Sequence, residues 1–237
     1  MNLPYVSVVI PTLNEENYLE LTLRALKGQD YEGKMEIIVA DGRSIDGTLK
    51  IAKKYADKVV AAEPGIARGR NAGARTANGG ILLFLDADTV AIANTVSELV
   101  RAMEHKDVLG ATCPVLPIGG RRSEMAFYSI LNDIVKQSIR IKKPHIPTIC
   151  VAYKREAFDA VGGFDEEMDT YEDSDLSRRI GKRGRMKFAG STTVLTSPRR
   201  LRGWGGATKS LLRYGIYGMY YKVTGNGVKI DKYKPIR

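Results

Sequence analysis

Two aspartates separated by one small residue stand directly after an apolar stretch, in Asp86-Ala87-Asp88. The preceding residues, 81–85, read Ile-Leu-Leu-Phe-Leu, and a strand with this sequence would deliver both carboxylates to the edge of a sheet. Carboxylates this close repel each other unless a cation neutralises them, and oxygen ligands favour Mg²⁺ or Mn²⁺. We therefore predict a divalent-metal site that neutralises a diphosphate. An acidic turn at a strand end, without any ligand, is the structural alternative.

A second segment that could do chemistry is rich in glycine and arginine. It runs from Gly65 to Gly73 and holds Arg68, Arg70 and Asn71 between its glycines. Small residues let the backbone approach a ligand closely, and arginine supplies paired hydrogen-bond donors for phosphate. The spacing is neither that of a dinucleotide-binding loop nor that of a Walker loop. A basic turn that opens a helix explains the same residues structurally.

A third segment, residues 165–175, is densely acidic and is followed at once by Arg178 and Arg179. A carboxylate held here, in Glu172 or Asp173, could remove a proton from a hydroxyl as that hydroxyl attacks. Acidic residues also favour the first turn of a helix, and Asp173 opens a helix-like stretch. Both interpretations can hold together.

These segments must be positioned by alternating strands and helices. Short β-branched or apolar runs predict strands at 6–10, 36–40, 58–61 and 81–85. Asn14 is predicted to cap a helix that reaches Lys27, and Asp46 to cap a second helix. This alternation indicates a parallel, doubly wound sheet, in which ligands bind beyond the carboxyl ends of the strands. The polar residues 11–15, 41–44 and 86–88 all follow strands, so we expect one shared site.

Composition limits the remaining possibilities. The chain has 237 residues, 43% of them hydrophobic and 27% charged, which suits one globular α/β domain. No stretch approaches a membrane span, and no secretory signal is visible. Cys113 and Cys150 are too few for a disulfide framework or a zinc site, so we expect core thiols and a reduced cytoplasmic setting.

The net charge of +10 is concentrated near the end of the chain. Residues 178–237 contain sixteen Lys or Arg and one acid, which indicates an anionic partner. Residues 211–221 mix aromatic and apolar side chains with flanking bases, as membrane–water interfaces favour; packing on the domain or on a second subunit is equally simple. Residues 125–135 predict a helix with a broad apolar face. We hypothesise an enzyme that works peripherally at the cytoplasmic membrane face, on a lipid-linked or otherwise amphiphilic acceptor.

The order and spacing of these pieces resemble the family 2 glycosyltransferases of GT-A fold. The resemblance runs from the first strand to about Ser197 and rests on residues 8–15, 41–48, 70–73, 86–88, 162–165 and 172–173. It implies a doubly wound, mostly parallel sheet with flanking helices and a helical, basic C-terminal extension. It also implies a domain at 1–200, with a nucleotide-binding half to about 90 and an acceptor half from about 91, and an extension at 201–237. The implied activity is inverting, single-displacement transfer from a nucleoside-diphosphate sugar.

The same resemblance implies roles for individual residues. Thr12, Glu15 and Asp41 would hold the base and ribose, and Arg70 would lie near the diphosphate. Asp88 would ligate the metal directly, with Asp86 at the ribose and metal. Asp173 would be the catalytic base, and Glu172 would assist it or position the acceptor. The nucleotide-sugar site would also include Pro11, Asn14, Ser44, Asn71 and Ala87.

One departure from the family pattern concerns the metal shell. Many relatives carry a histidine after the acidic segment, whereas the two histidines here, His105 and His145, both precede it. Arg199 and Arg200 stand in the equivalent region, where they would offset diphosphate charge.

Three other functions compete with this interpretation. A nucleotidyltransferase that makes the sugar nucleotide would carry a glycine-rich loop after the first strand, and residues 11–15 contain no glycine. A nucleic-acid-binding module is suggested by the net charge, but no RNP-like strand or zinc-finger spacing is present, so no nucleic-acid partner is expected. A non-catalytic sugar-nucleotide binder is the third. Whether the sugar donor carries uracil or guanine stays open.

Overall fold

The computed structural model describes residues 3–202 and, beyond them, residues 206, 209, 212, 215 and 224. The predicted helical extension and the interfacial role of 211–221 therefore lie almost wholly outside the described residues. The division of the domain near residue 90 also stays a prediction.

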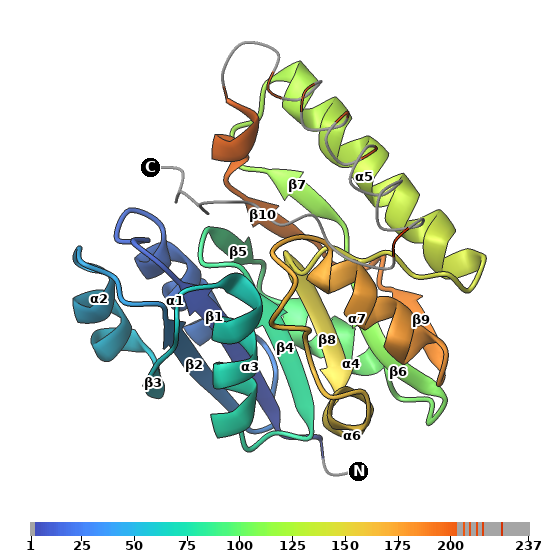
Figure 1. Cartoon of the computed structure of the whole chain (residues 1–237), viewed down its shortest axis with the longest axis horizontal. Helices are drawn as coiled ribbons and strands as arrows, with labels where there is room; N and C mark the ends of the chain where they lie inside the picture. The colour runs from blue at the N-terminus through green and yellow to red at the C-terminus, as the bar shows by residue number, and fades with distance from the viewer. Residues whose placement is uncertain are drawn as a thin grey trace.

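A seven-stranded sheet forms the centre of the molecule, in the order β3-β2-β1-β4-β8-β6-β9 (Figure 1). The sheet is mostly parallel, as predicted, because only β8 runs antiparallel to its neighbours β4 and β6. The strands are β1 (Val6–Thr12), β2 (Met35–Asp41), β3 (Lys58–Ala61), β4 (Ile81–Leu85), β6 (Val108–Thr112), β8 (Cys150–Lys154) and β9 (Arg185–Phe188).

The first strand continues through Pro11, one of the few places where a sheet tolerates proline. Its partners on β4 end at Val9, whereas the pairing with β2 continues to Thr12. The missing N–H of Pro11 therefore faces no partner on the β4 side. This is why β1 runs two residues beyond the predicted strand.

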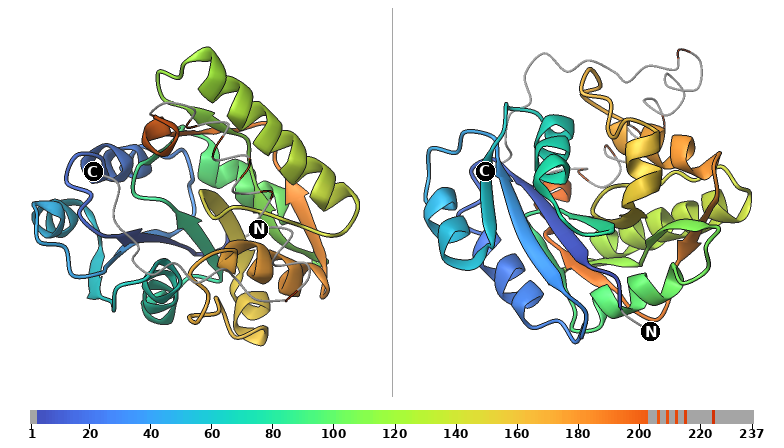
Figure 2. Two further views of the ribbon diagram at one scale, coloured as in Figure 1. Left: turned by 45° about the horizontal axis from the view of Figure 1, so that its top comes forward. Right: turned by 90° about the horizontal axis from the view of Figure 1, so that it is seen from below.

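Helices cover both faces of the sheet (Figure 2). One core cluster joins α1, α2 and α4 to Val8 and Ile10 of β1, and the other joins α3, α6 and α7 to Val9. Successive residues of β1 thus point into opposite cores, as a doubly wound sheet requires. The helices are α1 (Leu19–Lys27), α2 (Thr48–Tyr55), α3 (Ile66–Thr76), α4 (Thr95–Ala102), α5 (Arg122–Arg140), α6 (Arg155–Ala160) and α7 (Glu172–Gly181), with a 3₁₀ turn, η1 (Pro198–Leu201).

A second, three-stranded sheet lies at the carboxyl edge of the first. It has the order β5-β10-β7, formed by β5 (Thr89–Ala91), β10 (Val194–Thr196) and β7 (Val115–Pro117). The antiparallel pairing of β10 with β5 returns the chain to the acid pair, where the backbone N–H of Ser197 donates to the carbonyl of Asp88 at 3.0 Å. The sequence did not predict this sheet, because strands of three residues are too short to show the alternation of apolar and polar residues that indicates a strand.

The start of the first helix differs from its prediction. Asn14 does not cap it: α1 begins at Leu19, and Asn14 has a left-handed backbone with φ 55°. Its side-chain carbonyl accepts instead from the N–H of Ile45 at 2.9 Å, in the loop after β2. The second helix also starts differently from its prediction: its N-cap residue is Gly47, without a side-chain cap, and Asp46, one residue earlier, accepts from the N–H of Thr48 at 3.0 Å.

Both cysteines are free and buried, as predicted. Among the helices in the described ranges, none is long and apolar enough to cross a membrane.

A buried carboxylate ties the amino ends of the strands together. Glu36 is 4% exposed and accepts from the hydroxyl of Ser7 at 2.6 Å, the N–H of Asn78 at 2.6 Å and the ammonium of Lys58 at 2.9 Å. Burial alone would raise the pKa of Glu36, but the hydrogen bonds from Ser7 and Lys58 outweigh it and lower the pKa from 4.5 to about 2. A depressed pKa stabilises the fold above the ordinary value, and that stability disappears as pH falls towards 2.

We therefore expect Glu36→Gln to lower the free energy of unfolding by on the order of 2–3 kcal/mol at neutral pH, and by less near pH 3. Urea unfolding at the two pH values measures the difference. Glu32→Gln, at an exposed position, is the control and should change stability at neither pH. A pH-independent loss in Glu36→Gln would assign the effect to packing instead.

Candidate active site

The ends of β1 and β2 meet at the carboxyl edge of the sheet and share one polar network. Thr12 lies opposite Asp41, and its hydroxyl donates to Asp41 Oδ1 at 3.0 Å. The hydroxyl of Ser44 donates to the same oxygen at 2.6 Å, and its backbone N–H donates to Oδ2 at 2.9 Å. The N–H of Asn14 donates to the Ser44 hydroxyl at 2.8 Å. The structure thus brings together four of the residues predicted for the nucleotide-sugar site.

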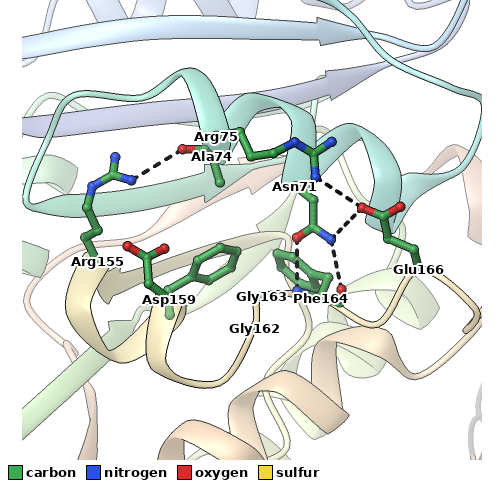
Figure 3. Close-up of a pocket in the computed structure, with 10 residues that line it drawn as sticks. Asn71, Ala74, Arg75, Arg155, Asp159, Gly162, Gly163, Phe164 and Glu166 are labelled. Atoms are coloured by element: carbon green, nitrogen blue, oxygen red, sulfur yellow. Dashed lines mark hydrogen bonds and ion pairs between the residues drawn. The ribbon is translucent and has the colours of Figure 1, made fainter.

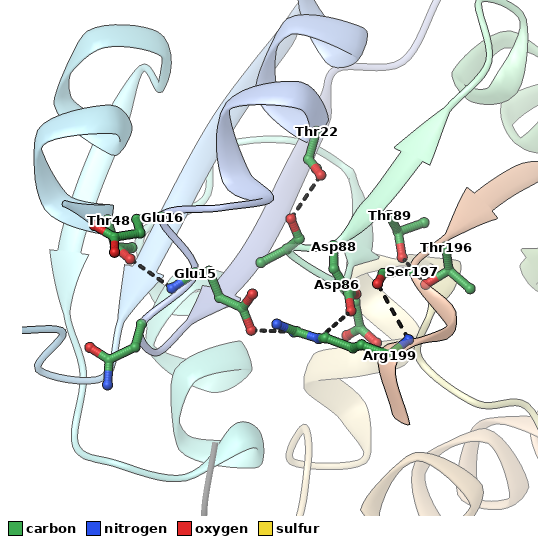
Figure 4. A network of polar contacts seen from close by, with 12 residues as sticks. Glu15, Glu16, Thr22, Thr48, Asp86, Asp88, Thr89, Thr196, Ser197 and Arg199 are labelled. Atoms are coloured by element: carbon green, nitrogen blue, oxygen red, sulfur yellow. Dashed lines mark hydrogen bonds and ion pairs between the residues drawn. The ribbon is translucent and has the colours of Figure 1, made fainter. Parts of the chain in front are cut away.

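The acid pair follows β4 on a backbone that is held from several sides. The N–H of Asp86 donates to the carbonyl of Ile149, and the carbonyl of Asp86 accepts from the N–H of Thr89, both at 3.1 Å. The carbonyl of buried Ala87 accepts from the hydroxyl of Thr22 at 2.8 Å (Figure 4). The two carboxylates are therefore presented on a preorganised turn, as a binding site requires.

Arg199 lies across this turn and joins it to the loop after β1 (Figure 4). Its guanidinium contacts Glu15 Oε1 at 2.5 Å and Asp88 Oδ2 at 3.0 Å. It also stacks over the ring of Tyr18, 4.5 Å from the centroid. The three charged side chains are 10–14% exposed, so this contact is largely shielded from water. Glu15 was predicted to hold the base and ribose, but its carboxylate is linked through Arg199 to Asp88 of the acid pair.

The electrostatics around Asp88 favour an additional cation. Burial and the neighbouring Asp86 raise the pKa of Asp88 to about 6, although Arg199 and Arg200 oppose the shift. The second carboxylate oxygen of Glu15, Oε2, is buried without a hydrogen-bond partner. No group of three metal-ligating side chains occurs in the described part of the chain. The residues thus fit a hard cation held by two carboxylates, with its remaining ligands supplied by phosphate and water.

Arg70 connects the acid pair to the acidic segment far along the chain. It is 3% exposed; it donates to Asp86 Oδ1 at 3.1 Å and to Glu172 Oε1 at 2.8 Å. Its guanidinium lies 5.3 Å from the ring centroid of Phe164. The predicted proximity of Arg70 to a diphosphate stays a prediction, because its observed contacts hold the two acidic segments together.

Helix α7 presents Glu172 and Asp173 in different environments. The helix begins at Glu172, directly after Tyr171, whose backbone is left-handed with φ 66°. Burial and the charge of Asp173 raise the pKa of Glu172, and Arg70 opposes the rise. Asp173 is half-buried and accepts from the N–H of Ser174 at 2.6 Å. Within the described residues Asp173 forms no ion pair, and its role as the base stays a prediction.

Some residues at the site were missed by sequence reasoning. His145, which was noted only as preceding the acidic segment, has Nε2 3.5 Å from the Ser174 hydroxyl and its ring 5.3 Å from that of Tyr171. Tyr18, beneath Arg199, was not singled out either. Neither residue belongs to a spacing pattern that could have pointed to the site.

Three predicted residues lie around this centre rather than in it. Asn71 uses its amide to hold another loop: it donates to the carbonyl of Phe164 at 2.8 Å and to Glu166 at 2.9 Å, beside a cavity of about 560 Å³ (Figure 3). Pro11 lies under α3. Arg200 is exposed next to Arg199. Binding of a nucleotide sugar by these residues stays a prediction.

The doubly wound sheet, with its acid pair at the carboxyl edge, is a GT-A fold. Residues 7–162 match the model for glycosyl transferase family 2, and the chain belongs to that family. It is 28% identical over 193 residues to the glycosyltransferase AglE of Haloferax volcanii, covering 77% of this chain and 63% of AglE. It is 35% identical over 109 residues to the uncharacterized glycosyltransferase YfnE of Bacillus subtilis, covering 44% and 28%. The chain thus spans less than two thirds of these relatives.

Solved structures share the fold at lower sequence identity. The mannosyltransferase PcManGT from Pyrobaculum calidifontis, in complex with GDP-Man and Mn²⁺, has a TM-score of 0.70 and 22% identity, over 98% of this chain and 68% of that one. Staphylococcus aureus TarS 1–349, in complex with UDP-GlcNAc, has a TM-score of 0.67 and 22% identity, over 88% and 61%.

Proposed function

We propose that this chain is an inverting glycosyltransferase that moves a sugar from a nucleoside-diphosphate sugar to a hydroxyl or phosphate acceptor. The observation that carries the proposal is the bridge formed by Arg70 between Asp86 and Glu172. It joins an acid pair suited to a metal–diphosphate to a separate carboxylate segment suited to a base. Inverting transfer needs these two functions on opposite sides of one anomeric carbon.

The nucleoside would occupy the network of Thr12, Asp41 and Ser44 at the ends of β1 and β2. Mg²⁺ or Mn²⁺ at Asp88 and Asp86 would, when bound, act as a Lewis acid on the diphosphate. Complexes of similar folds with GDP-Man and Mn²⁺, and with UDP-GlcNAc, support a GDP- or UDP-linked sugar donor and a divalent cation.

In the transfer step, Asp173 accepts the proton of the acceptor hydroxyl. The hydroxyl oxygen forms a bond to the anomeric carbon as the bond from that carbon to the diphosphate oxygen breaks, and the nucleoside diphosphate leaves with the bonding electrons. Glu172, held by Arg70, orients the acceptor. Arg199 and Arg200 offset the negative charge that develops on the leaving group.

The acceptor is proposed to be lipid-linked or otherwise amphiphilic, at the cytoplasmic face of a membrane. Support comes from the charge of the chain, since residues 178–237 contain sixteen bases and one acid. Such a segment attracts anionic surfaces.

The expected result is metal-dependent thermal stabilisation by either UDP- or GDP-sugars, with loss of that stabilisation in Asp88→Ala. A ligand raises the melting temperature according to its affinity, and Asp88→Ala removes a carboxylate on which the metal–donor complex depends. Thermal shift with each sugar nucleotide, with and without Mn²⁺, measures both. Asp107→Ala is the matched control, because this aspartate is 58% exposed and forms its ion pair with exposed Arg185. An unchanged titration in Asp88→Ala would remove the metal assignment.

Product analysis then separates the competing functions. The transferase releases nucleoside diphosphate, whereas a nucleotidyltransferase releases pyrophosphate. Stabilisation by a sugar nucleotide with no release of either product, across a panel of lipid-linked and soluble acceptors, would instead identify a non-catalytic binder.

A further inference from the structure

Helix α5 carries an apolar stripe along its outer side. Ile130 and Ile134 are 45% and 46% exposed, and Ile141, directly after the helix, is 63% exposed. Exposed Ala126 precedes Ile130 by one turn. Residues spaced by four, four and seven lie on one side of an α-helix, so these side chains form a continuous line rather than scattered positions.

The stripe cannot turn inward, because the opposite side of α5 is already packed. Phe127, Tyr128 and Val135 are 4%, 6% and 4% exposed and lie in the two core clusters. In Figure 1 the helix forms an outer border of the molecule, beyond β7. Rotation about its axis would expose these three large side chains, so the fold fixes the isoleucines outward.

The stripe is also a concentration of exposed apolar surface. Nine large hydrophobic side chains are exposed among the described residues, and five of them fall between residues 118 and 141. Single exposed hydrophobic residues are ordinary, whereas an aligned group rimmed by polar residues marks an interaction site.

The charges beside the stripe specify the partner. Six exposed basic residues lie on or next to α5, and in the described part of the chain none forms an ion pair: Arg121, Arg122, Lys136, Arg140, Lys142 and Lys143. Residues 121–143 contain two acids, of which Glu124 is buried and Asp133 exposed. Arg122 and Arg140 are about five turns apart, so they share a line parallel to the apolar stripe.

We propose that the outer side of α5 docks on an anionic lipid bilayer. The isoleucines enter the boundary between headgroups and acyl chains, and the basic side chains contact lipid phosphates. Self-association would bring the same basic line of two copies together, whereas an anionic bilayer satisfies the apolar and the basic lines at once. This inference deepens the proposed acceptor class, but it does not depend on the transfer reaction.

The position of α5 relative to the site gives this docking a functional consequence. Phe127 and Tyr128 share their core cluster with Leu201 of η1. Two residues earlier in η1, Arg199 contacts Asp88. A bilayer held by α5 would therefore lie at the edge of the molecule that adjoins the acid pair, where an amphiphilic acceptor is presented.

Co-sedimentation of the full chain with vesicles tests the proposal. The wild type is expected to bind phosphatidylcholine vesicles that contain phosphatidylglycerol, more weakly as salt is raised. Ile130→Ser/Ile134→Ser is expected to lower the partition coefficient by roughly tenfold, because two apolar side chains no longer enter the bilayer. Lys136→Glu/Arg140→Glu should lower it at least as much.

Matched controls separate α5 from general surface effects. Leu21→Ser/Ile45→Ser removes two apolar side chains that are 56% and 84% exposed elsewhere, and it should leave binding unchanged. All variants retain the basic C-terminal segment, so any binding that this segment provides is the same in each. Equal binding by the α5 variants and the wild type would therefore overturn the proposal. It would also be overturned if the wild type bound no anionic vesicles, or if light scattering showed a dimer that Ile130→Ser/Ile134→Ser dissociates. Release of nucleoside diphosphate without vesicles tests the transferase proposal independently.

Discussion

Asp173→Asn is expected to lower turnover by about 10²–10⁴-fold while the affinity for the sugar donor stays near that of the wild type. The change removes a proton acceptor with almost no change in volume. Asp173 has no ion pair among the described residues, and it accepts from the N–H of Ser174. We therefore expect the substitution to affect the chemical step more than the stability of the fold. Single-turnover kinetics, together with calorimetric titration of the sugar donor, measure the two quantities separately.

Glu172→Gln is the matched control for this prediction. Glu172 is buried against Arg70, so its substitution should weaken acceptor binding and stability more than the chemical step. If Asp173→Asn keeps near-wild-type turnover while Glu172→Gln abolishes it, the base is Glu172. That outcome would fit the raised pKa of Glu172, which arises from burial and from the charge of Asp173.

Much of the fold could be predicted from the sequence because β1, β2 and β4, at its centre, are buried on both faces. The strands predicted at 58–61 and 81–85 have the bounds observed for β3 and β4. Leu19, Leu23 and Leu26, which follow helical spacing in the first helix, are all buried. Continuous apolar runs and helical spacing are local features of the sequence, so they can be recognised without knowledge of the tertiary structure.

The contacts inside the site could not be predicted in the same way. Arg199 and Glu15 are 184 residues apart in sequence, and Arg70 and Glu172 are 102 apart. The sequence predicted that all four residues lie near a ligand. It did not predict which carboxylate each arginine neutralises. The pairing of Arg199 follows from the small second sheet, which returns the chain to Asp88 and has strands too short to leave a pattern.

Arg70→Met is expected to lower the free energy of unfolding by about 3–5 kcal/mol, because it leaves two carboxylates without their buried counter-ion. Arg70 is 3% exposed, and it contacts both Asp86 and Glu172. Urea denaturation measures the loss. Arg75→Met, on the same helix, is the control: Arg75 is 66% exposed and lies 3.4 Å from Glu166, so its loss should change stability by no more than about 0.5 kcal/mol.

The pH dependence of this loss identifies its cause. Without Arg70, the pKa of Glu172, already raised above 4.5 by burial and by Asp173, should rise further. A carboxyl whose pKa is raised by folding stabilises the protein below its ordinary pKa, and this contribution disappears as pH rises through the raised value. The destabilisation by Arg70→Met should therefore be smaller near pH 5 than near pH 8. Arg70→Met/Glu172→Gln should recover part of the loss at the higher pH, because no charge then remains buried at position 172. Equal losses at both pH values, with no recovery in the double variant, would mean that Arg70 acts through packing against Phe164 rather than through the two carboxylates.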